Sequence, residues 1–252
     1  MEITILGSGT STGVPEVGCT CAVCKSSDPH DNRLRASALV KTKGTNILID
    51  CGPDFREQML HSKYDRLDGV LITHEHYDHV GGIDDLRPFC RFGEVPLYAE
   101  ESTGRRLRTR MPYCFAEHKY PGVPQISITD ITCGVPFNIN SVEILPIRVM
   151  HGKNPIVGYR IENVAYITDM LTMPQDEYKK LKGLDCLIMN ALREEPHITH
   201  QNLNQAIENA EKIDAKQTWF IHMSHHMGLH AEVEKQLPPN MHFAYDRLVI
   251  KP

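Results

Sequence analysis

Short apolar segments alternate with polar loops along the chain, a pattern typical of β-strands rather than of long helices. Eight such segments are predicted as strands, and several of them end directly at an ionisable residue. They span residues 2–7, 45–50, 68–73, 95–99, 141–147, 164–169, 185–190 and 217–222. This arrangement favours a layered protein whose chemistry lies where its strands end.

Helical patterns are fewer and fall between these segments. In residues 201–213 the apolar positions follow helical spacing, and Thr199 is available as the N-terminal cap. Residues 172–183 form a second predicted helix, with Thr172 as its cap and Gly183 at its end. No repeat, low-complexity tract or linker divides the chain clearly.

Composition narrows the classes of partner. The 252 residues are 41% hydrophobic, enough for a sizeable core, and no apolar run approaches the roughly 18 residues that span a bilayer. The first residues lack the basic flank of a secretion signal, so we expect a cytoplasmic protein without a membrane partner. The net charge of −5 disfavours nucleic acid as a binding partner. The stretch GRRLRTR at residues 104–110 is a local basic cluster, which we interpret as a solvated helix face.

The stretch LITHEHYDHVGG at residues 71–82 places three histidines and an aspartate within six positions. Side chains two apart on an extended backbone point to the same side, so His74 and His76 can converge on one ion. Asp78 and His79 lie after the chain has turned and can serve a second ion. Zinc, manganese and iron accept these ligands, so the stretch predicts a metal site, with a polar surface loop as the alternative.

One segment cannot complete two metal shells, so further ligands must come from elsewhere in the chain. Three candidates each follow a predicted strand, namely His151, Asp169 and His222. Taken singly, each is better explained as an ordinary loop residue or as a buried residue with satisfied hydrogen bonds. Together they supply the ligands that the histidine-rich stretch lacks.

The eight cysteines fall into two groups. In a reducing compartment clustered thiols more often bind metal than form disulfides, which draws attention to Cys19, Cys21 and Cys24 in the stretch CTCAVC. The other five stand singly and are expected to be small core side chains. They are Cys51, Cys90, Cys114, Cys133 and Cys186.

The motif H-x-H-x-D-H at residues 74–79 resembles the signature of the metallo-β-lactamase superfamily, and the likeness also includes LIDCGPD (48–54) and FIHMSHH (220–226). The resemblance implies an α/β fold, an αββα sandwich of two mixed β-sheets flanked by helices, in a single domain over residues 1–252. It also implies two active-site divalent metals. The first would be held by His74, His76 and His151, and the second by Asp78, His79 and His222, with Asp169 bridging them.

The stretch GCTCAVCKS, which follows GSGTSTGVPEV, resembles the PhnP family of cyclic phosphodiesterases from bacterial phosphonate breakdown. This resemblance implies a structural Zn²⁺ in a loop at about residues 15–30, a closed Cys₃His shell without an open position for water. Its ligands would be Cys19, Cys21, Cys24 and His225. His226 is the alternative histidine, and a redox-sensitive thiol patch is the alternative to zinc.

The stretch PHITHQN holds His197 and His200, which that assignment leaves free of metal. Hydrolysis of a cyclic phosphodiester expels an alkoxide that must be protonated, so a free histidine near the metals has a task. The family pattern H-x-T-H selects His200 as the general acid, while Asp78 would hold the second metal and orient the nucleophile. The alternative is a histidine that caps or packs the following helix.

The resemblance implies a phosphoric diester hydrolase of the carbon–phosphorus lyase pathway. Its small-molecule substrate would be 5-phospho-α-D-ribosyl 1,2-cyclic phosphate, opened to ribose 1,5-bisphosphate by a hydroxide held between two metals. The resemblance also implies Mn²⁺ in the active site, although the ligands do not exclude zinc or iron. A homodimer is a further expectation, because family members commonly pair. Three alternatives stay open: a tRNA 3′-processing endonuclease, a thioester or lactone hydrolase, and a nonenzymatic zinc-binding protein.

Overall fold

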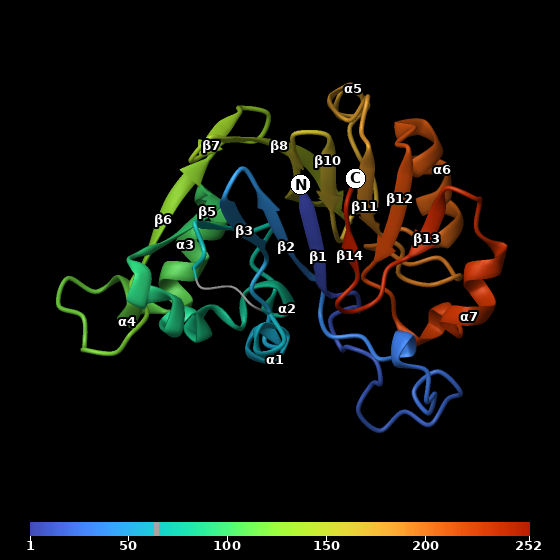
Figure 1. The fold of residues 1–252 in the computed structure, drawn as a ribbon, viewed down its shortest axis with the longest axis horizontal. Helices are drawn as coiled ribbons and strands as arrows, with labels where there is room; N and C mark the ends of the chain where they lie inside the picture. Colours follow the sequence, from blue (N-terminus) through green and yellow to red (C-terminus); the bar gives the residue numbers. More distant parts are fainter. Residues whose placement is uncertain (63–65) are drawn as a thin grey trace.

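The computed structural model describes residues 1–62 and 66–252, which form two seven-stranded β-sheets with helices on their outer faces (Figure 1). The first sheet contains β1 (Glu2–Gly7), β2 (Ser37–Thr42), β3 (Thr45–Ile49), β4 (Gly69–Leu71), β5 (Val95–Glu100), β6 (Ile126–Ile131) and β14 (Val249–Ile250). The second contains β7 (Phe137–Ile139), β8 (Val142–His151), β9 (Asn154–Ile161), β10 (Val164–Ile167), β11 (Cys186–Asn190), β12 (Gln217–Ile221) and β13 (Met241–Phe243).

The helices of the described residues are short. The α-helices are α1 (Phe55–Leu60), α2 (Tyr77–Val80), α3 (Glu101–Arg110), α4 (Pro112–Phe115), α5 (Glu177–Lys180), α6 (Leu203–Ile213) and α7 (His230–Val233). The 3₁₀ helices are η1 (Pro29–Asp31), η2 (Ile83–Phe92), η3 (His225–Met227) and η4 (Glu234–Gln236).

Both sheets are mixed. The first has the order β14-β1-β2-β3-β4-β5-β6, with antiparallel pairs from β14 to β3 and parallel pairs from β3 to β6. The second has the order β13-β12-β11-β10-β9-β8-β7, parallel from β13 to β10 and antiparallel from β10 to β7. The predicted αββα sandwich is confirmed.

Three apolar layers hold the sandwich together. Side chains of both sheets meet between them, with Ile47 and Leu71 from the first and Tyr159 and Ile188 from the second in one buried cluster. A second cluster lies between the second sheet and helices such as α6, and a third lies beneath α3 and its neighbours on the first sheet. Because each sheet is covered on both faces, its strands are near-continuous apolar runs, which explains why the sequence pattern reveals them.

All eight predicted strands lie on observed strands, with ends that differ by a few residues. The prediction omits β2, β6, β7, β9, β13 and β14. Three of these have only two or three residues, and β9 contains Pro155 and Gly158, which disfavour a strand in the sequence pattern.

The helix predicted over residues 201–213 is present as α6, but its predicted cap is wrong. Asn202 caps the helix instead of Thr199, because the Asn202 side chain accepts a hydrogen bond from the backbone N–H of Gln205 at 3.0 Å. The Gln205 side chain accepts in return from the backbone N–H of Asn202 at 3.0 Å. The two residues form a reciprocal capping box.

The helix predicted over residues 172–183 is largely wrong. Only Glu177–Lys180 is helical, and Asp176 rather than Thr172 occupies the N-terminal cap position. The carbonyl of Thr172 accepts a hydrogen bond from the backbone N–H of Met150 at 2.9 Å, at the end of β8. Pairing with a distant strand thus overrides the local helical pattern.

The single cysteines divide by position. Cys51, Cys114 and Cys186 are buried as expected, whereas Cys90 and Cys133 are half-buried, so the core prediction is wrong for these two. Both lie near the surface with a sulfur that donates to a backbone carbonyl.

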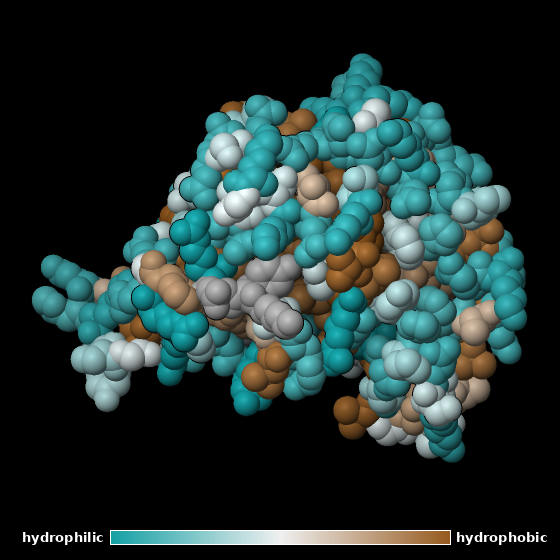
Figure 2. Space-filling view, viewed as in Figure 1, coloured by the Kyte–Doolittle hydropathy of each residue, from teal (hydrophilic) through white to brown (hydrophobic). Residues whose placement is uncertain are grey.

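The outer surface is mostly polar. Hydrophilic side chains cover most of the face in Figure 2, and apolar side chains form separate patches there. Within residues 1–62 and 66–252, no helix has the length and apolar character needed to cross a bilayer.

The turn after β3, which contains Gly52, lies in close contact with the segment from Asp78 to Gly82. A Cβ at Gly52 would lie 2.1 Å from the carbonyl oxygen of Asp78, and a Cβ at Gly82 would lie 2.0 Å from the carbonyl oxygen of Gly52. The backbone N–H of Cys51 donates to the carbonyl of His79 at 2.7 Å. The turn after β3 therefore fixes the position of α2.

Gly52→Ala should destabilise the protein and displace the Asp78 backbone, because the added methyl group would lie 2.1 Å from the Asp78 carbonyl oxygen. We expect the free energy of unfolding in urea to fall by about 3 kcal/mol. Gly183→Ala is the matched control, since Gly183 has φ +73° and no atom within 4 Å of the added Cβ. Its loss should be about 1 kcal/mol, the cost of the left-handed backbone alone. Equal losses in the two variants would contradict the steric explanation.

Candidate metal centres

Ionisable side chains from both sheets meet at one edge of the sandwich, where strands end. The turn after β4 and helix α2 supply four of the predicted ligands, and the ends of β8, β10 and β12 supply one each. All of them are buried except His76, which is exposed. The seven residues are His74, His76, Asp78, His79, His151, Asp169 and His222.

The set predicted for the second metal gathers around one point. The nearest ligand atoms of Asp78, His79, Asp169 and His222 all lie within 4.8 Å of one another. Asp169 Oδ1 is 3.2 Å from His79 Nε2 and 3.3 Å from His222 Nε2. Asp78 Oδ2 is 3.1 Å from His79 Nε2. These four side chains can therefore hold a single cation.

The set predicted for the first metal is less compact. His74 Nε2 lies 3.0 Å from His76 Nδ1 and 3.9 Å from Asp169 Oδ2. The His151 ring is 5.2 Å from the His76 ring, centroid to centroid. His151 and Asp169 also gather with His200 in a second group of candidate ligands. The structure thus brings His200 into the cluster alongside the predicted ligands.

Unpartnered ring nitrogens show that these residues suit a cation. Nε2 of His79 and both ring nitrogens of His222 are buried without a hydrogen-bond partner among the described residues. An unsatisfied buried polar group costs about 1–3 kcal/mol. A divalent metal would supply the missing partner, and imidazole with carboxylate is a donor set that zinc, manganese and iron accept.

The electrostatics of Asp169 and His74 agree with this donor set. Burial would raise the pKa of Asp169, but the neighbouring His222 and His79 outweigh it and hold the pKa well below its ordinary value. Burial, reinforced by His79, lowers the pKa of His74 well below its ordinary value. Asp169 is therefore ionised and His74 neutral near pH 7, the protonation states that metal ligands require. At His79 burial is outweighed by the carboxylates of Asp169, Asp78 and Asp50, which raise the pKa of the ring well above its ordinary value, so a metal would have to displace a proton there.

Asp50 is a functional residue that the sequence analysis missed. His79 Nδ1 donates to Asp50 Oδ2 at 2.7 Å, and the backbone N–H of Thr73 donates to Asp50 Oδ1 at 2.8 Å. These bonds turn His79 so that its Nε2 faces the cluster. Such carboxylate–histidine pairs orient metal ligands. The signal available in the sequence was the aspartate that ends the segment TNILID.

Three of the residues at these strand ends have a left-handed backbone. The φ angles are +59° at Asp50, +56° at Asp169 and +60° at His222. For residues with a Cβ this conformation costs about 1–2 kcal/mol each. The sharp turn that it creates directs each side chain into the cluster directly after its strand, so part of the backbone strain of the protein lies at this site.

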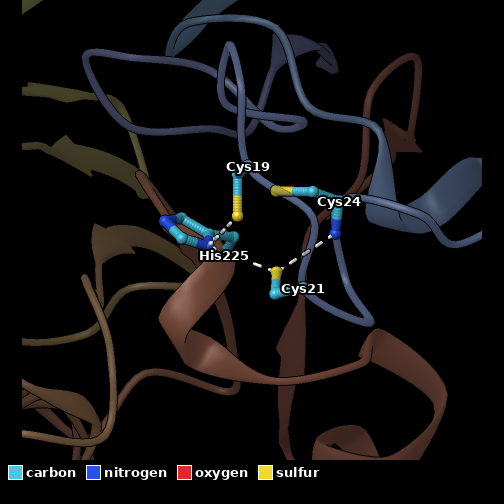
Figure 3. A group of neighbouring side chains, drawn as sticks. All are labelled: Cys19, Cys21, Cys24 and His225. Atoms are coloured by element: carbon cyan, nitrogen blue, oxygen red, sulfur yellow. Dashed lines mark hydrogen bonds between the residues drawn. The ribbon is translucent and has the colours of Figure 1, made fainter.

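A second cluster joins the N-terminal loop to η3. Figure 3 shows Cys19, Cys21 and Cys24 around His225, and their ligand atoms all lie within 4.8 Å of one another. His225 Nδ1 is 3.4 Å from the sulfur atoms of both Cys19 and Cys21. Glu16 Oε2 lies 3.2 Å from His225 Nε2, which leaves Nδ1 for the sulfur side.

The structure distinguishes the two candidate histidines by position. His226 is exposed and lies outside the cysteine group, with its ring 4.0 Å from that of His225. A backbone hydrogen bond from Cys24, helped by His225, lowers the pKa of the Cys21 thiol to about 6, whereas burial raises that of Cys24 to about 11. Three sulfurs and one imidazole match the donor set of a closed structural zinc site.

The two clusters are connected through the segment between His222 and His225. The backbone N–H of Thr10 donates to the carbonyl of Met223 at 3.0 Å, and the backbone N–H of Met223 donates to the carbonyl of Ser8 at 3.1 Å. The glycine-containing turn after β1 therefore runs beside the edge that carries the histidine and aspartate cluster before it enters the loop with the three cysteines.

His200 and His197 occupy different environments. The His200 ring is buried, with its centroid 4.5 Å from that of His151 and 5.0 Å from that of His222. His197 is half-buried, and its Nδ1 accepts from the backbone N–H of Thr199 at 3.3 Å. Burial lowers the pKa of His200 to about 3, so its imidazole is neutral in the free site.

This fold and this set of buried ligands define a metal-binding protein of a known class. The chain belongs to the β-lactamase superfamily domain family, whose model matches residues 45–223.

Three known proteins show which kinds of protein this chain is similar to. A solved structure described as a new diphosphatase from the PhnP family is 42% identical, with a TM-score of 0.92, and covers 99% of this chain and 97% of its own. An octanoyltransferase of Porphyromonas gingivalis is 46% identical over 98% of this chain, which spans only 51% of that longer protein. A ribonuclease Z of Anoxybacillus flavithermus is 29% identical over 64% of this chain and 48% of its own length.

His225→Ala should remove one metal equivalent from the purified protein, because it deletes the only imidazole within the cysteine group of the described residues. His226→Ala is the matched control and should keep the full metal content. Metal analysis by inductively coupled plasma mass spectrometry measures both. Loss of zinc from the His226 variant alone would reverse the assignment.

Asp50→Asn should weaken metal binding at the active site by about 10- to 100-fold, because the neutral amide no longer holds His79 with an ionic hydrogen bond. Competition with a chelating dye measures the affinity, and circular dichroism checks the fold. His197→Ala, which alters a histidine outside the ligand groups of the described residues, should leave the affinity unchanged. An unchanged affinity in folded Asp50→Asn would show that Asp50 does not support a ligand.

Proposed function

We propose that this protein is a metal-dependent phosphodiesterase that opens 5-phospho-α-D-ribosyl 1,2-cyclic phosphate to ribose 1,5-bisphosphate. The observation that carries the proposal is His200, a buried histidine placed against His151 and His222 at the candidate dimetal site. The likeness to a PhnP-family structure and the Cys₃His cluster support the choice of substrate. Mn²⁺ in the active site and Zn²⁺ in the cysteine cluster are part of this proposal.

The proposed residues divide the work between binding and proton transfer. Bound metals would supply an activated water and neutralise charge on the phosphoryl oxygens. Asp169 lies between the two ligand sets and would be a ligand of both ions. Asp78 would hold the second ion and orient the attacking water.

His200 would protonate the leaving group. Water attacks phosphorus, the bond from phosphorus to the C2 oxygen breaks, and the departing alkoxide takes a proton from the protonated His200 ring, which becomes neutral. The proton lost by the attacking water leaves to solvent. The product keeps phosphate on C1 and carries a free hydroxyl on C2. Since burial holds the pKa of His200 at about 3 in the free site, the proton must enter with the substrate, whose negative charge raises the pKa of a neighbouring imidazole.

A second candidate reaction is hydrolysis of a diphosphate. The 42% identical structure is described as a diphosphatase, and the same pair of metals would suit attack on a phosphoric anhydride. The two reactions differ in their leaving groups. A departing phosphate needs no proton, whereas a sugar alkoxide does.

His200→Ala tests whether His200 is the general acid of the proposed phosphodiesterase reaction. We expect a loss of about 10²- to 10⁴-fold in kcat/KM with the cyclic ribosyl substrate, and a much smaller loss with bis(p-nitrophenyl) phosphate, whose phenolate leaves unaided. Steady-state rates followed by phosphorus NMR and by absorbance measure the two reactions. His197→Ala is the control and should affect neither. Equal losses on both substrates would exclude general acid catalysis by His200.

A further inference from the structure

An open hollow of about 830 Å³ lies beside the candidate metal ligands. One wall consists of Glu75 and His76, from the turn that also supplies His74. The other wall is α3, which contributes Arg105, Arg106 and Arg110, together with Ser102 and Thr109. The hollow therefore extends from a candidate metal ligand to a row of arginines.

The charges in this hollow do not cancel. Arg106 pairs with the Glu75 carboxylate, and Arg110 Nη1 donates to the Glu75 carbonyl at 3.0 Å. Arg105 has a weaker partner, since its Nη1 is 4.0 Å from Glu101 Oε1 and both side chains are largely exposed. Three guanidinium groups and one carboxylate line the hollow, so it carries excess positive charge although the whole chain has a net charge of −5.

Helix α3 directs these arginines to one side. Residues 105, 106, 109 and 110 are neighbours at helical spacing, and all four line the hollow. Leu107 is buried in the core beneath the helix. Arg108 points elsewhere, with its guanidinium 6.0 Å from the centre of the Phe115 ring. The interpretation of GRRLRTR as a helix is confirmed, but its arginines are sorted between two different surroundings.

We propose that this hollow is an anion subsite that binds a phosphate group of the substrate other than the one that is cleaved. The proposal rests on the proposed function and defines its substrate class as a phosphodiester that also carries a phosphomonoester. Arg105 would contact that phosphate directly, because a guanidinium group can donate two parallel hydrogen bonds to phosphate oxygens. Arg106 and Arg110 would add charge while they hold the Glu75 segment.

Kinetics with matched substrates test the subsite. Arg105→Gln should raise KM for 5-phospho-α-D-ribosyl 1,2-cyclic phosphate by about 10- to 100-fold with little change in kcat, as expected for a contact that is equal in ground and transition states. Its effect on bis(p-nitrophenyl) phosphate should be less than twofold. Arg108→Gln removes the same charge from the same helix outside the hollow, and should change neither reaction.

An equal rise in KM for Arg105→Gln and Arg108→Gln would overturn the subsite, because it would show that the effect comes from the net charge of the helix and not from a contact in the hollow. An unchanged KM in Arg105→Gln would overturn it as well. Stronger inhibition by a short single-stranded RNA than by ribose 5-phosphate, weakened equally by both substitutions, would replace it with a nucleic-acid contact.

Inhibition separates this proposal from the proposed function. If the wild-type protein hydrolyses bis(p-nitrophenyl) phosphate but leaves the cyclic ribosyl substrate intact, the proposed reaction fails while the subsite can still be judged. Ribose 5-phosphate should then inhibit the nitrophenyl reaction far better than ribose, and Arg105→Gln should weaken that inhibition by about tenfold. Equal inhibition of the wild type and the variant would exclude the subsite independently.

Discussion

The buried charge of Asp169 is the constraint on which the rest of the structure depends. Its side chain is almost completely shielded from water, where an isolated carboxylate is strongly unfavourable. The compensating groups come from the sides of both sheets: His79 from α2, which follows β4 of the first sheet, and His222 from the end of β12 in the second. The two sheets must therefore end at the same edge, and the apolar layer between them holds that register. The orphaned ring nitrogens around Asp169 show that the protein atoms alone leave this compensation incomplete.

Much of the fold could be predicted because the sheets are covered on both faces. Strand β10 is an apolar run that is buried throughout, and the ionisable residue that soon follows such a run marks the edge of the sandwich that carries the candidate ligands. Features set by distant partners could not be predicted. Thr172 belongs to a helical sequence pattern, yet its carbonyl accepts a hydrogen bond from the backbone N–H of Met150 in β8. Strands of two or three residues carry no periodicity by which to recognise them.

The candidate site, like the fold, could be predicted from the sequence only in part. His74, His76, Asp78 and His79 are recognisable because ligand types are dense in a short stretch. The supporting role of Asp50 is not recognisable, because it depends on a bond to His79 across 29 positions of sequence. Likewise, the spacing of the arginines on α3 predicts a helix but does not show that Glu75 lies opposite them. The sequence reveals the side chains that can bind a metal, whereas the tertiary structure shows which other side chains keep them in position.

The left-handed backbone at Asp50, Asp169 and His222 has a consequence for engineering. Glycine would relieve this strain, but it would also remove a side chain that compensates buried neighbours, so these three residues cannot simply be exchanged for glycine to gain stability. Stability must instead be gained in the three apolar layers. Substrate range, by contrast, can be altered on the exposed face of α3 without adding strain. The fold thus separates the residues that an engineer can vary from those whose unfavourable geometry must be kept.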